Sequence, residues 1–123
     1  MPRMTELKQY SGGCHCGQVR FEVEADLAAP VIECNCSICG KSGTRLTFVP
    51  AAQFKLLQGE DGLTDYLFAK QHIHHLFCNR CGIKSFARGA TPDGDQMFAI
   101  NARCLDGADL EALTVQHFDG KSL

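Results

Sequence analysis

Cys34-Asn35-Cys36-Ser37-Ile38-Cys39 places three thiols within six consecutive positions. A C-x-C step followed by a C-x-x-C step lets three sulfur atoms converge on one point where the backbone turns. A zinc ion takes four ligands in a tetrahedron, and thiolate is among its preferred partners. Three thiolates from one segment leave one position of the tetrahedron unfilled. Another residue fills that position in a structural site, whereas water or substrate fills it in a catalytic site.

Two further motifs place cysteines at similarly short spacings. Cys14-His15-Cys16-Gly17 is a C-x-C-G motif, and Cys78-Asn79-Arg80-Cys81-Gly82 is a C-x-x-C-G motif. The central C-x-x-C step is also followed by a glycine, Gly40. Glycine accepts the backbone conformation in which N–H groups point towards a bound sulfur. All three motifs therefore predict a metal-binding knuckle.

The spacing alone leaves the pairing of these motifs open. Joining the central C-x-x-C step to the last motif would give a zinc ribbon, but residues 40–77 make a longer gap than the roughly 15–20 residues of a usual ribbon. Joining the first motif to the last gives a four-thiolate site and leaves the central segment as a separate three-thiolate site. We favour this second division because it uses seven cysteines in two sites and ties the start of the chain to its middle.

The composition predicts one small globular domain. The chain has 123 residues, of which 45% are hydrophobic and 21% are charged, as in ordinary folded proteins. At this length one domain, residues 1–123, is the expectation. The net charge of −2 shows no basic excess, so we expect neither nucleic acid nor an acidic membrane surface as a partner.

Eight cysteines would also fit an extracellular disulfide scaffold. Residues 1–10, however, show no apolar segment of the kind found in a signal peptide. No apolar run in the sequence approaches the length of a membrane helix. We therefore expect a cytoplasmic protein, in which clustered cysteines bind metal more often than they form disulfides.

Short alternating or β-branched segments predict an all-β fold. Residues 18–24 and 83–88 alternate polar and apolar side chains with the period of two of a half-buried strand. Residues 1–13 are expected to be a polar lead-in, and one short helix is expected at 105–113. Further strands are expected at 31–33, 44–49, 54–57, 63–68, 71–77, 96–101 and 114–118.

The other polar side chains carry weaker signals. Cys104 is more typical of a small buried apolar residue than of a fourth metal ligand. His72 and His74, followed by His75, share a face of an expected strand, and a solvated face is a commoner role for them than metal binding or proton transfer. The remaining histidines and three cations are expected on the surface, where one or two of the cations could meet an anionic ligand: His15, His117, Lys41, Arg45 and Arg103.

The complete cysteine pattern resembles that of the glutathione-dependent formaldehyde-activating enzyme family, which also includes centromere protein V. The pattern consists of C-x-C-G at 14–17, C-x-C-x-x-C at 34–39 and F-C-x-x-C-G at 77–82. Lys41-Ser42-Gly43 and Asn101-Ala102-Arg103-Cys104-Leu105-Asp106 also look familial, and the likeness runs from about residue 11 to about residue 110. Gly40 is a departure, because relatives often carry a longer and frequently basic residue there.

The resemblance implies a β-tent of small antiparallel sheets that holds two zinc ions. It implies a structural zinc and a second, open zinc site at the active centre. The ligands that it implies are Cys14, Cys16, Cys78 and Cys81 for the structural zinc, and Cys34, Cys36 and Cys39 for the second zinc.

The resemblance also implies an activity. Enzymes of this family are named for joining glutathione to formaldehyde, which gives S-hydroxymethylglutathione, and are classed as carbon–sulfur lyases acting in reverse. We therefore expect a thiol such as glutathione and a small aldehyde as partners. Lys41 and Arg103 are the candidates to bind the anionic groups of the thiol.

Two alternatives remain open. One is a non-catalytic module that binds zinc or carries glutathione, in which Cys104 or a histidine completes the second zinc site. The other is a zinc-ribbon protein that binds nucleic acid, which the acidic charge balance disfavours.

Overall fold

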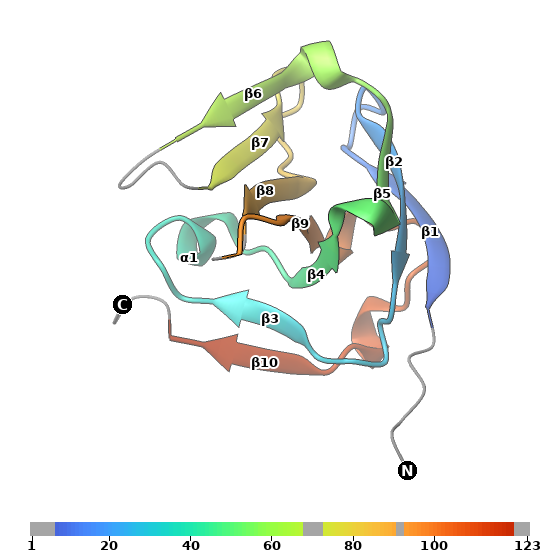
Figure 1. Cartoon of the computed structure of the whole chain (residues 1–123), viewed down its shortest axis with the longest axis vertical. Helices are drawn as coiled ribbons and strands as arrows, with labels where there is room; N and C mark the ends of the chain where they lie inside the picture. The colour runs from blue at the N-terminus through green and yellow to red at the C-terminus, as the bar shows by residue number, and fades with distance from the viewer. Residues whose placement is uncertain (1–6, 68–72, 91–92, 120–123) are drawn as a thin grey trace.

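The computed structural model describes residues 7–67, 73–90 and 93–119. Within these residues the chain forms ten strands, one short α-helix and several 3-10 turns, and the strands make up two sheets (Figure 1). The predicted all-β fold is confirmed. None of these residues belongs to a helix with the length and apolar character needed to cross a membrane.

The smaller sheet has the antiparallel order β1-β2-β5, formed by β1 (Lys8–Gly13), β2 (Arg20–Ala25) and β5 (Phe54–Gln58). Strand β2 alternates as its sequence predicts, with Phe21 and Val23 almost completely buried. The prediction that residues 1–13 form a polar lead-in is wrong for residues 8–13. These residues form β1, which pairs with β2 along its whole length. Its polar side chains hide the strand in the sequence because most of them face solvent.

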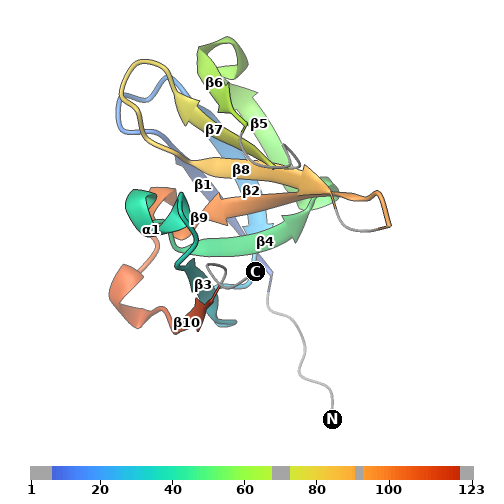
Figure 2. The same ribbon diagram turned by 90° about the vertical axis from the view of Figure 1, so that its left-hand side faces the viewer.

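The larger sheet has the order β10-β3-β4-β9-β8-β7-β6. Its neighbouring strands are antiparallel except β3 and β10, which run parallel. The sheet curls strongly from β6 at one end to β10 at the other (Figures 1 and 2). Its strands are β3 (Val31–Cys34), β4 (Leu46–Pro50), β6 (Leu63–Tyr66), β7 (His74–Cys78), β8 (Phe86–Ala90), β9 (Gln96–Asn101) and β10 (Val115–Phe118).

Most expected strands are present with small shifts at their ends, although residues 68 and 71–72 lie outside the described residues. The helix expected at 105–113 is wrong, since only a 3-10 turn, Leu110–Ala112, forms there. Gly107 has a φ of 72°, which interrupts a right-handed helix, and Leu105 is drawn into the core. The α-helix that does form, α1 (Cys39–Ser42), is a single turn.

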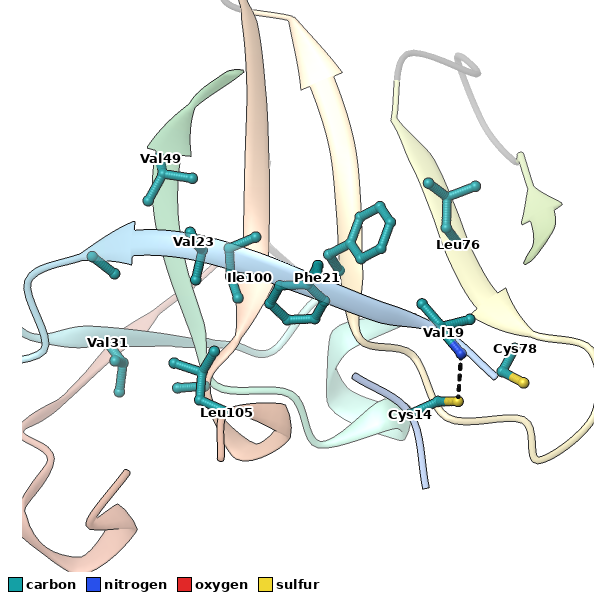
Figure 3. Packing of buried hydrophobic residues seen from close by; sticks show 13 residues of the cluster. Cys14, Val19, Phe21, Val23, Val31, Val49, Leu76, Cys78, Ile100 and Leu105 are labelled. Atoms are coloured by element: carbon teal, nitrogen blue, oxygen red, sulfur yellow. Dashed lines mark hydrogen bonds between the residues drawn. The ribbon is translucent and has the colours of Figure 1, made fainter. Parts of the chain in front are cut away.

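The core lies between the two sheets and is centred on aromatic rings (Figure 3). Phe54 of the smaller sheet stacks on Phe98 of the larger sheet with ring centroids 4.2 Å apart. Phe21 and Phe86 pack around this pair, at 5.4 Å and 4.8 Å from the Phe54 ring. These contacts join the two sheets, so one face of the larger sheet is covered.

The opposite face of the larger sheet is also apolar. Because side chains alternate along a strand, Phe98 and Ile100 of β9 point into the core while Ala99 between them points the other way. Phe48 on β4 lies on the same face as Ala99, with which it is paired. Figure 1 shows α1 on this side of the sheet, away from β1, β2 and β5. Cys39, which begins α1, therefore lies beside an apolar surface.

Candidate functional site

The four cysteines of the first and last motifs, whose pairing the sequence analysis favoured, come together in the structure. The sulfur atoms of Cys14, Cys16, Cys78 and Cys81 all lie within 4.8 Å of one another. The Sγ atom of Cys16 is 3.6 Å from those of both Cys14 and Cys78. A tetrahedral zinc with bonds of about 2.3 Å would hold its sulfurs about 3.8 Å apart. The donor set and its spacing therefore fit a four-thiolate zinc site.

Tight turns direct these sulfurs inwards. Gly17 and Gly82 have φ angles of 83° and 80°, the left-handed region that favours glycine. The Gly82 N–H donates to the Cys78 carbonyl at 2.8 Å and closes the turn. The amide of Arg80 then points at the Cys78 sulfur, with N and Sγ 3.4 Å apart. The predicted role of glycine in the knuckle is confirmed at these two positions.

Backbone amides also stabilise the charged form of two of these thiols, Cys78 and Cys81. The amide of Ile83 is the main cause that lowers the pKa of the Cys81 thiol to about 6, although partial desolvation opposes it. For Cys78 desolvation raises the pKa, but the amides of Cys81 and Arg80 more than offset it and the pKa is lowered. Thiolate is the form that binds metal.

Gln18 supports this cluster, and nothing in the sequence pointed to it. Its side-chain amide lies 3.3 Å from the Cys78 sulfur and donates to the Asn79 side-chain oxygen at 3.1 Å. Groups that hydrogen-bond to metal ligands fix the orientation of those ligands. A lone glutamine at the start of a strand carries no spacing signal, so only the folded chain could reveal it.

The second cluster consists of Cys34, Cys36 and Cys39, whose sulfur atoms lie within 4.8 Å of one another. Cys34 ends β3 and Cys39 begins α1. The N–H of Gly40 donates to the Cys36 carbonyl at 2.8 Å, so the chain turns back on itself between the two elements. The N–H of Cys36 points at the Cys34 sulfur at 3.4 Å. The predicted knuckle forms here as well, since the amides of Ile38 and Cys39 hydrogen-bond to the Cys36 sulfur. Its glycine differs, because Gly40 lies inside the helical turn and not in the left-handed region.

Among the described residues, no fourth cysteine, histidine or carboxylate joins these three sulfurs within the same distance. Cys104, the alternative fourth ligand, lies in neither cluster. It is half-buried, with its sulfur 3.9 Å from the Lys84 carbonyl, and burial raises the pKa of its thiol.

A polar cavity of about 570 Å³ opens on one side of the second cluster, and Cys34 and Cys39 form part of its wall. Arg103 lines this cavity, whereas Lys41 is exposed at the end of α1 and does not. Arg45 also lines it, with its Nε 3.2 Å from a carboxylate oxygen of Glu33. Of the two cations expected to bind an anionic thiol, Arg103 therefore lines the cavity beside the cysteines and Lys41 does not.

An apolar cavity of about 390 Å³ opens on the other side of the cluster. All three cysteines of the cluster line it, together with the face of the larger sheet that the core leaves free. The polar groups in its wall, besides the thiols, are those of Lys84, His75 and Arg88. Its apolar lining is Ile32, Ile38, Leu46, Phe48, Ile73, Ala87, Gly89, Ala90, Met97, Ala99 and Phe118.

Lys84 and His75 form a hydrogen-bonded pair in the wall of this apolar cavity. The Lys84 Nζ lies 2.8 Å from His75 Nδ1. Burial, and then the positive charge of Lys84, lower the pKa of His75 to about 4. His75 is therefore neutral at pH 7, and its Nδ1 accepts the hydrogen bond from Lys84. Burial lowers the pKa of Lys84 itself, while the charges of Cys39 and Cys36 raise it.

The other described histidines lie outside the apolar cavity, and His117 lines the polar one. His74 points away from its neighbour His75 and pairs with Asp65, with Nδ1 and Oδ2 2.6 Å apart. His72, expected on the same face as His74, lies outside the described residues. His15 and His117 are exposed, as expected. The histidine in the wall of the apolar cavity is thus His75, which the strand pattern did not place on the same face as His72 and His74.

Comparisons with known proteins agree with this picture. The model of the family described as "Glutathione-dependent formaldehyde-activating enzyme" matches residues 9–118. A Halomonas elongata protein named "Putative glutathione-dependent formaldehyde-activating enzyme" is 38% identical over 57% of this chain and 50% of its own length. The chain thus spans about half the length of that curated relative.

A crystal structure of a Rhodobacter sphaeroides protein superimposes with a TM-score of 0.78 and 28% sequence identity. The match covers 88% of this chain and 99% of that one, so the fold is shared over nearly the whole length of the solved structure. Taken with the family match over residues 9–118, these findings show that the chain belongs to the glutathione-dependent formaldehyde-activating enzyme family.

Proposed function

We propose that the chain catalyses the addition of a thiol such as glutathione to a small aldehyde at the cluster of Cys34, Cys36 and Cys39. Formaldehyde is the aldehyde that the family description names. The product would be an S-hydroxymethyl thiol, and the reaction class that of a carbon–sulfur lyase acting in reverse. The observation that carries the proposal is the position of three convergent sulfurs between a polar and an apolar cavity.

We infer two zinc ions per chain. The four-sulfur cluster would hold a structural zinc through Cys14, Cys16, Cys78 and Cys81, and the three-sulfur cluster would hold the second. With three thiolate ligands, a zinc ion there would supply the positive charge that keeps a fourth sulfur deprotonated, while the net charge of −1 suits thiol chemistry better than water activation. The convergence of each set of sulfurs within 4.8 Å supports this assignment.

The residues of the chain have separate tasks in this reaction. Arg103, in the wall of the polar cavity, would bind a carboxylate of the thiol. The thiol sulfur forms a bond to the carbonyl carbon, and the π electrons of the C=O bond move to oxygen. Lys84, in the wall of the apolar cavity, would donate a hydrogen bond to that oxygen. The oxygen finally takes up a proton, which balances the one lost by the thiol.

The cysteine clusters can be tested separately. Cys36→Ser should lower the zinc content from two ions to one and abolish the addition, while the far-ultraviolet circular dichroism stays that of the wild type. Cys81→Ser should unfold or aggregate the protein, because a structural zinc supplies roughly 10–16 kcal/mol of apparent folding energy. Metal analysis, circular dichroism and the rate of glutathione addition to formaldehyde are measured on each variant.

Two results would contradict the proposal. Retention of two zinc ions by both cysteine variants would show that the ligand assignment is wrong. A wild type that fails to accelerate the addition, and whose zinc keeps the same sulfur shell in X-ray absorption spectra when glutathione is added, would be the non-catalytic module instead.

A further inference from the structure

Small side chains hollow the apolar cavity out of the sheet. Ala87 on β8 and Ala99 on β9 are paired across neighbouring strands, and both line the cavity. Gly89, two residues along β8, lines it as well. Larger side chains, among them Phe48 and Met97, stand beside these positions. Leucine or valine at the two alanines would fill the hollow, so its depth depends on their size.

The cavity is much larger than formaldehyde. Its volume is about 390 Å³, within the range of roughly 300–1,000 Å³ for small-molecule sites. Formaldehyde has two non-hydrogen atoms, and one water molecule takes up about 30 Å³ of liquid water. A site for formaldehyde alone would need only a small part of this volume. The remaining space can hold a substituent of several carbon atoms.

Exposed apolar side chains gather at the same cavity. Phe48, Ile73 and Phe118 are 52%, 49% and 48% exposed, and all three line it. Single exposed apolar residues are ordinary on a protein surface, but a contiguous group commonly marks a binding site. An apolar ligand bound in the cavity would cover these side chains.

The second cysteine cluster lies where the two cavities meet. Cys34 and Cys39 line both the polar and the apolar cavity. Arg103 and Arg45 line the polar cavity together with Glu33 and Asp119, so its charges of both signs match the carboxylates and the ammonium group of a peptide thiol. The apolar cavity is then left for the second reactant, with its carbonyl group towards the cysteines and Lys84.

We propose that the enzyme acts on aldehydes that carry an apolar substituent of several carbons, and that the cavity floored by Ala87 and Ala99 binds this substituent. The proposal rests on the thiol addition proposed above and narrows its substrate class. The bond that forms is still the one between the thiol sulfur and the carbonyl carbon, and the thiol proton ends on the aldehyde oxygen. No oxidant or reductant takes part.

Binding of unreactive product analogues tests the cavity without catalysis. S-methylglutathione and S-hexylglutathione share the peptide part and differ by five methylene groups. Each methylene buried from water strengthens binding roughly fourfold, so the zinc-loaded wild type should bind the hexyl conjugate at least about tenfold more tightly in calorimetric titrations. Ala99→Leu should reduce this ratio towards one. Ala112→Leu, the same change at an exposed turn, should leave the ratio as it is.

Kinetics test the same assignment for the aldehyde. The kcat/KM for glutathione addition is measured with hexanal and with formaldehyde, after subtraction of the uncatalysed rate. The wild type should favour hexanal by about tenfold or more, and Ala99→Leu should lower the ratio of hexanal to formaldehyde by at least about tenfold. If Ala99→Leu fails to fold, the binding ratio and the kcat/KM ratio of the wild type decide the test by themselves.

The failures are distinguishable. Catalysis with formaldehyde, without preference for hexanal and with equal binding of the two conjugates, would overturn the apolar substituent but keep the thiol addition. Absence of catalysis with either aldehyde would overturn the addition, and the aldehyde assignment with it. Equal binding of the conjugates by a wild type that sediments as a dimer, and that Phe48→Lys converts to monomers, would assign the apolar face to a second copy of the chain.

Discussion

Lys84 differs from the other described lysines in its surroundings. Lys8, Lys41 and Lys55 are exposed, whereas Lys84 is half-buried and hydrogen-bonded to His75 beside the second cysteine cluster. A partly desolvated ammonium group is an effective hydrogen-bond donor to a developing alkoxide, because little water competes for it. Its position makes it the strongest candidate for the donor that thiol addition requires.

Lys84→Met should therefore reduce the kcat/KM of glutathione addition about 10²- to 10³-fold, the usual effect of removing one such donor. Methionine keeps the length of the side chain but has no N–H group. Zinc content should stay at two per chain, since Lys84 belongs to neither sulfur cluster. Lys55→Met, at an exposed position of β5, is the matched control, and equal rates for the two variants would exclude a role for Lys84.

His75 predicts a pH dependence of stability. Its pKa is about 4 in the folded protein, against about 6.5 for an ordinary histidine. Burial of the ring is the main cause, the charges of Lys84 and His74 act in the same direction, and Asp65 opposes them. Between these two pH values the unfolded chain binds the proton more readily, so the free energy of unfolding should fall as the pH drops from about 6.5 towards 4.

His75→Asn tests this dependence, because the asparagine oxygen can accept the hydrogen bond from Lys84 but does not titrate. Denaturant midpoints are compared at pH 7 and pH 5.5 for both proteins. The wild type should lose more stability than His75→Asn over this interval. The cysteine clusters are the same in both proteins, so their own response to pH cancels, and equal losses would contradict the assignment.

At the scale of elements, two motifs with the same C-x-x-C-G sequence adopt different structures. In the last motif Gly82 ends a knuckle with a φ of 80°, whereas in the central motif Gly40 lies inside α1 and Gly43 takes the left-handed conformation instead. The backbone of β3 feeds the central motif directly into a helical turn. The glycine N–H closes the turn in both motifs, but only Gly82 takes the left-handed conformation.

Gly82→Ala and Gly40→Ala should consequently change stability in opposite directions. A Cβ at Gly82 would meet no atom within 4 Å, so its cost is the left-handed backbone alone, about 1–2 kcal/mol. At Gly40 a Cβ would make only ordinary contacts, the nearest at 3.6 Å, and alanine should stabilise the helical turn by about 0.5–1 kcal/mol. Urea denaturation of the zinc-loaded proteins measures both, and effects of the same sign would contradict this interpretation.

At the scale of the whole molecule, the larger sheet is apolar on both faces and each face has its own role. One face packs on the smaller sheet through Phe21, Phe54, Phe86 and Phe98. The other face forms the cavity beside the second cysteine cluster. The core thus covers one face of the sheet, and the other face is available for binding.

Two phenylalanine-to-alanine changes should separate these roles. Phe86 is 2% exposed in the core, so Phe86→Ala should lower the free energy of unfolding by about 3–5 kcal/mol. Phe48 is 52% exposed at the cavity, so Phe48→Ala should cost less than about 1 kcal/mol. Denaturation curves give both values, and a large loss for Phe48→Ala would place that side chain in the core instead.

Strands were predicted correctly where polar and apolar side chains alternate strongly, and one strand was missed where most side chains are polar. Phe21 and Val23 mark β2 clearly, but β1 is polar and is held in place by its pairing with β2. The helix expected at 105–113 failed because Leu105 is used as a core residue and Gly107 breaks the helical conformation. The partner strand of β1 and the core contacts of Leu105 lie elsewhere in the sequence, so a local pattern does not contain them. Gly107, by contrast, lies within the segment and is a local signal against the helix.

The amino-acid sequence by itself determined the three cysteine motifs and the family, because C-x-C and C-x-x-C spacings set the directions of sulfurs within one turn of backbone. The spacing left the pairing of the motifs open, and the folded chain joins the first motif to the last and leaves the central one as a second group. Only the tertiary structure decided what surrounds the second group. His75, Ala87 and Ala99 come from β7, β8 and β9 of one curled sheet, and Lys84 comes from the connection before β8. Each looks like an ordinary surface or core residue in its own segment. A cavity is formed by side chains brought together from several strands, so its shape and polarity exist only once the sheet has assembled.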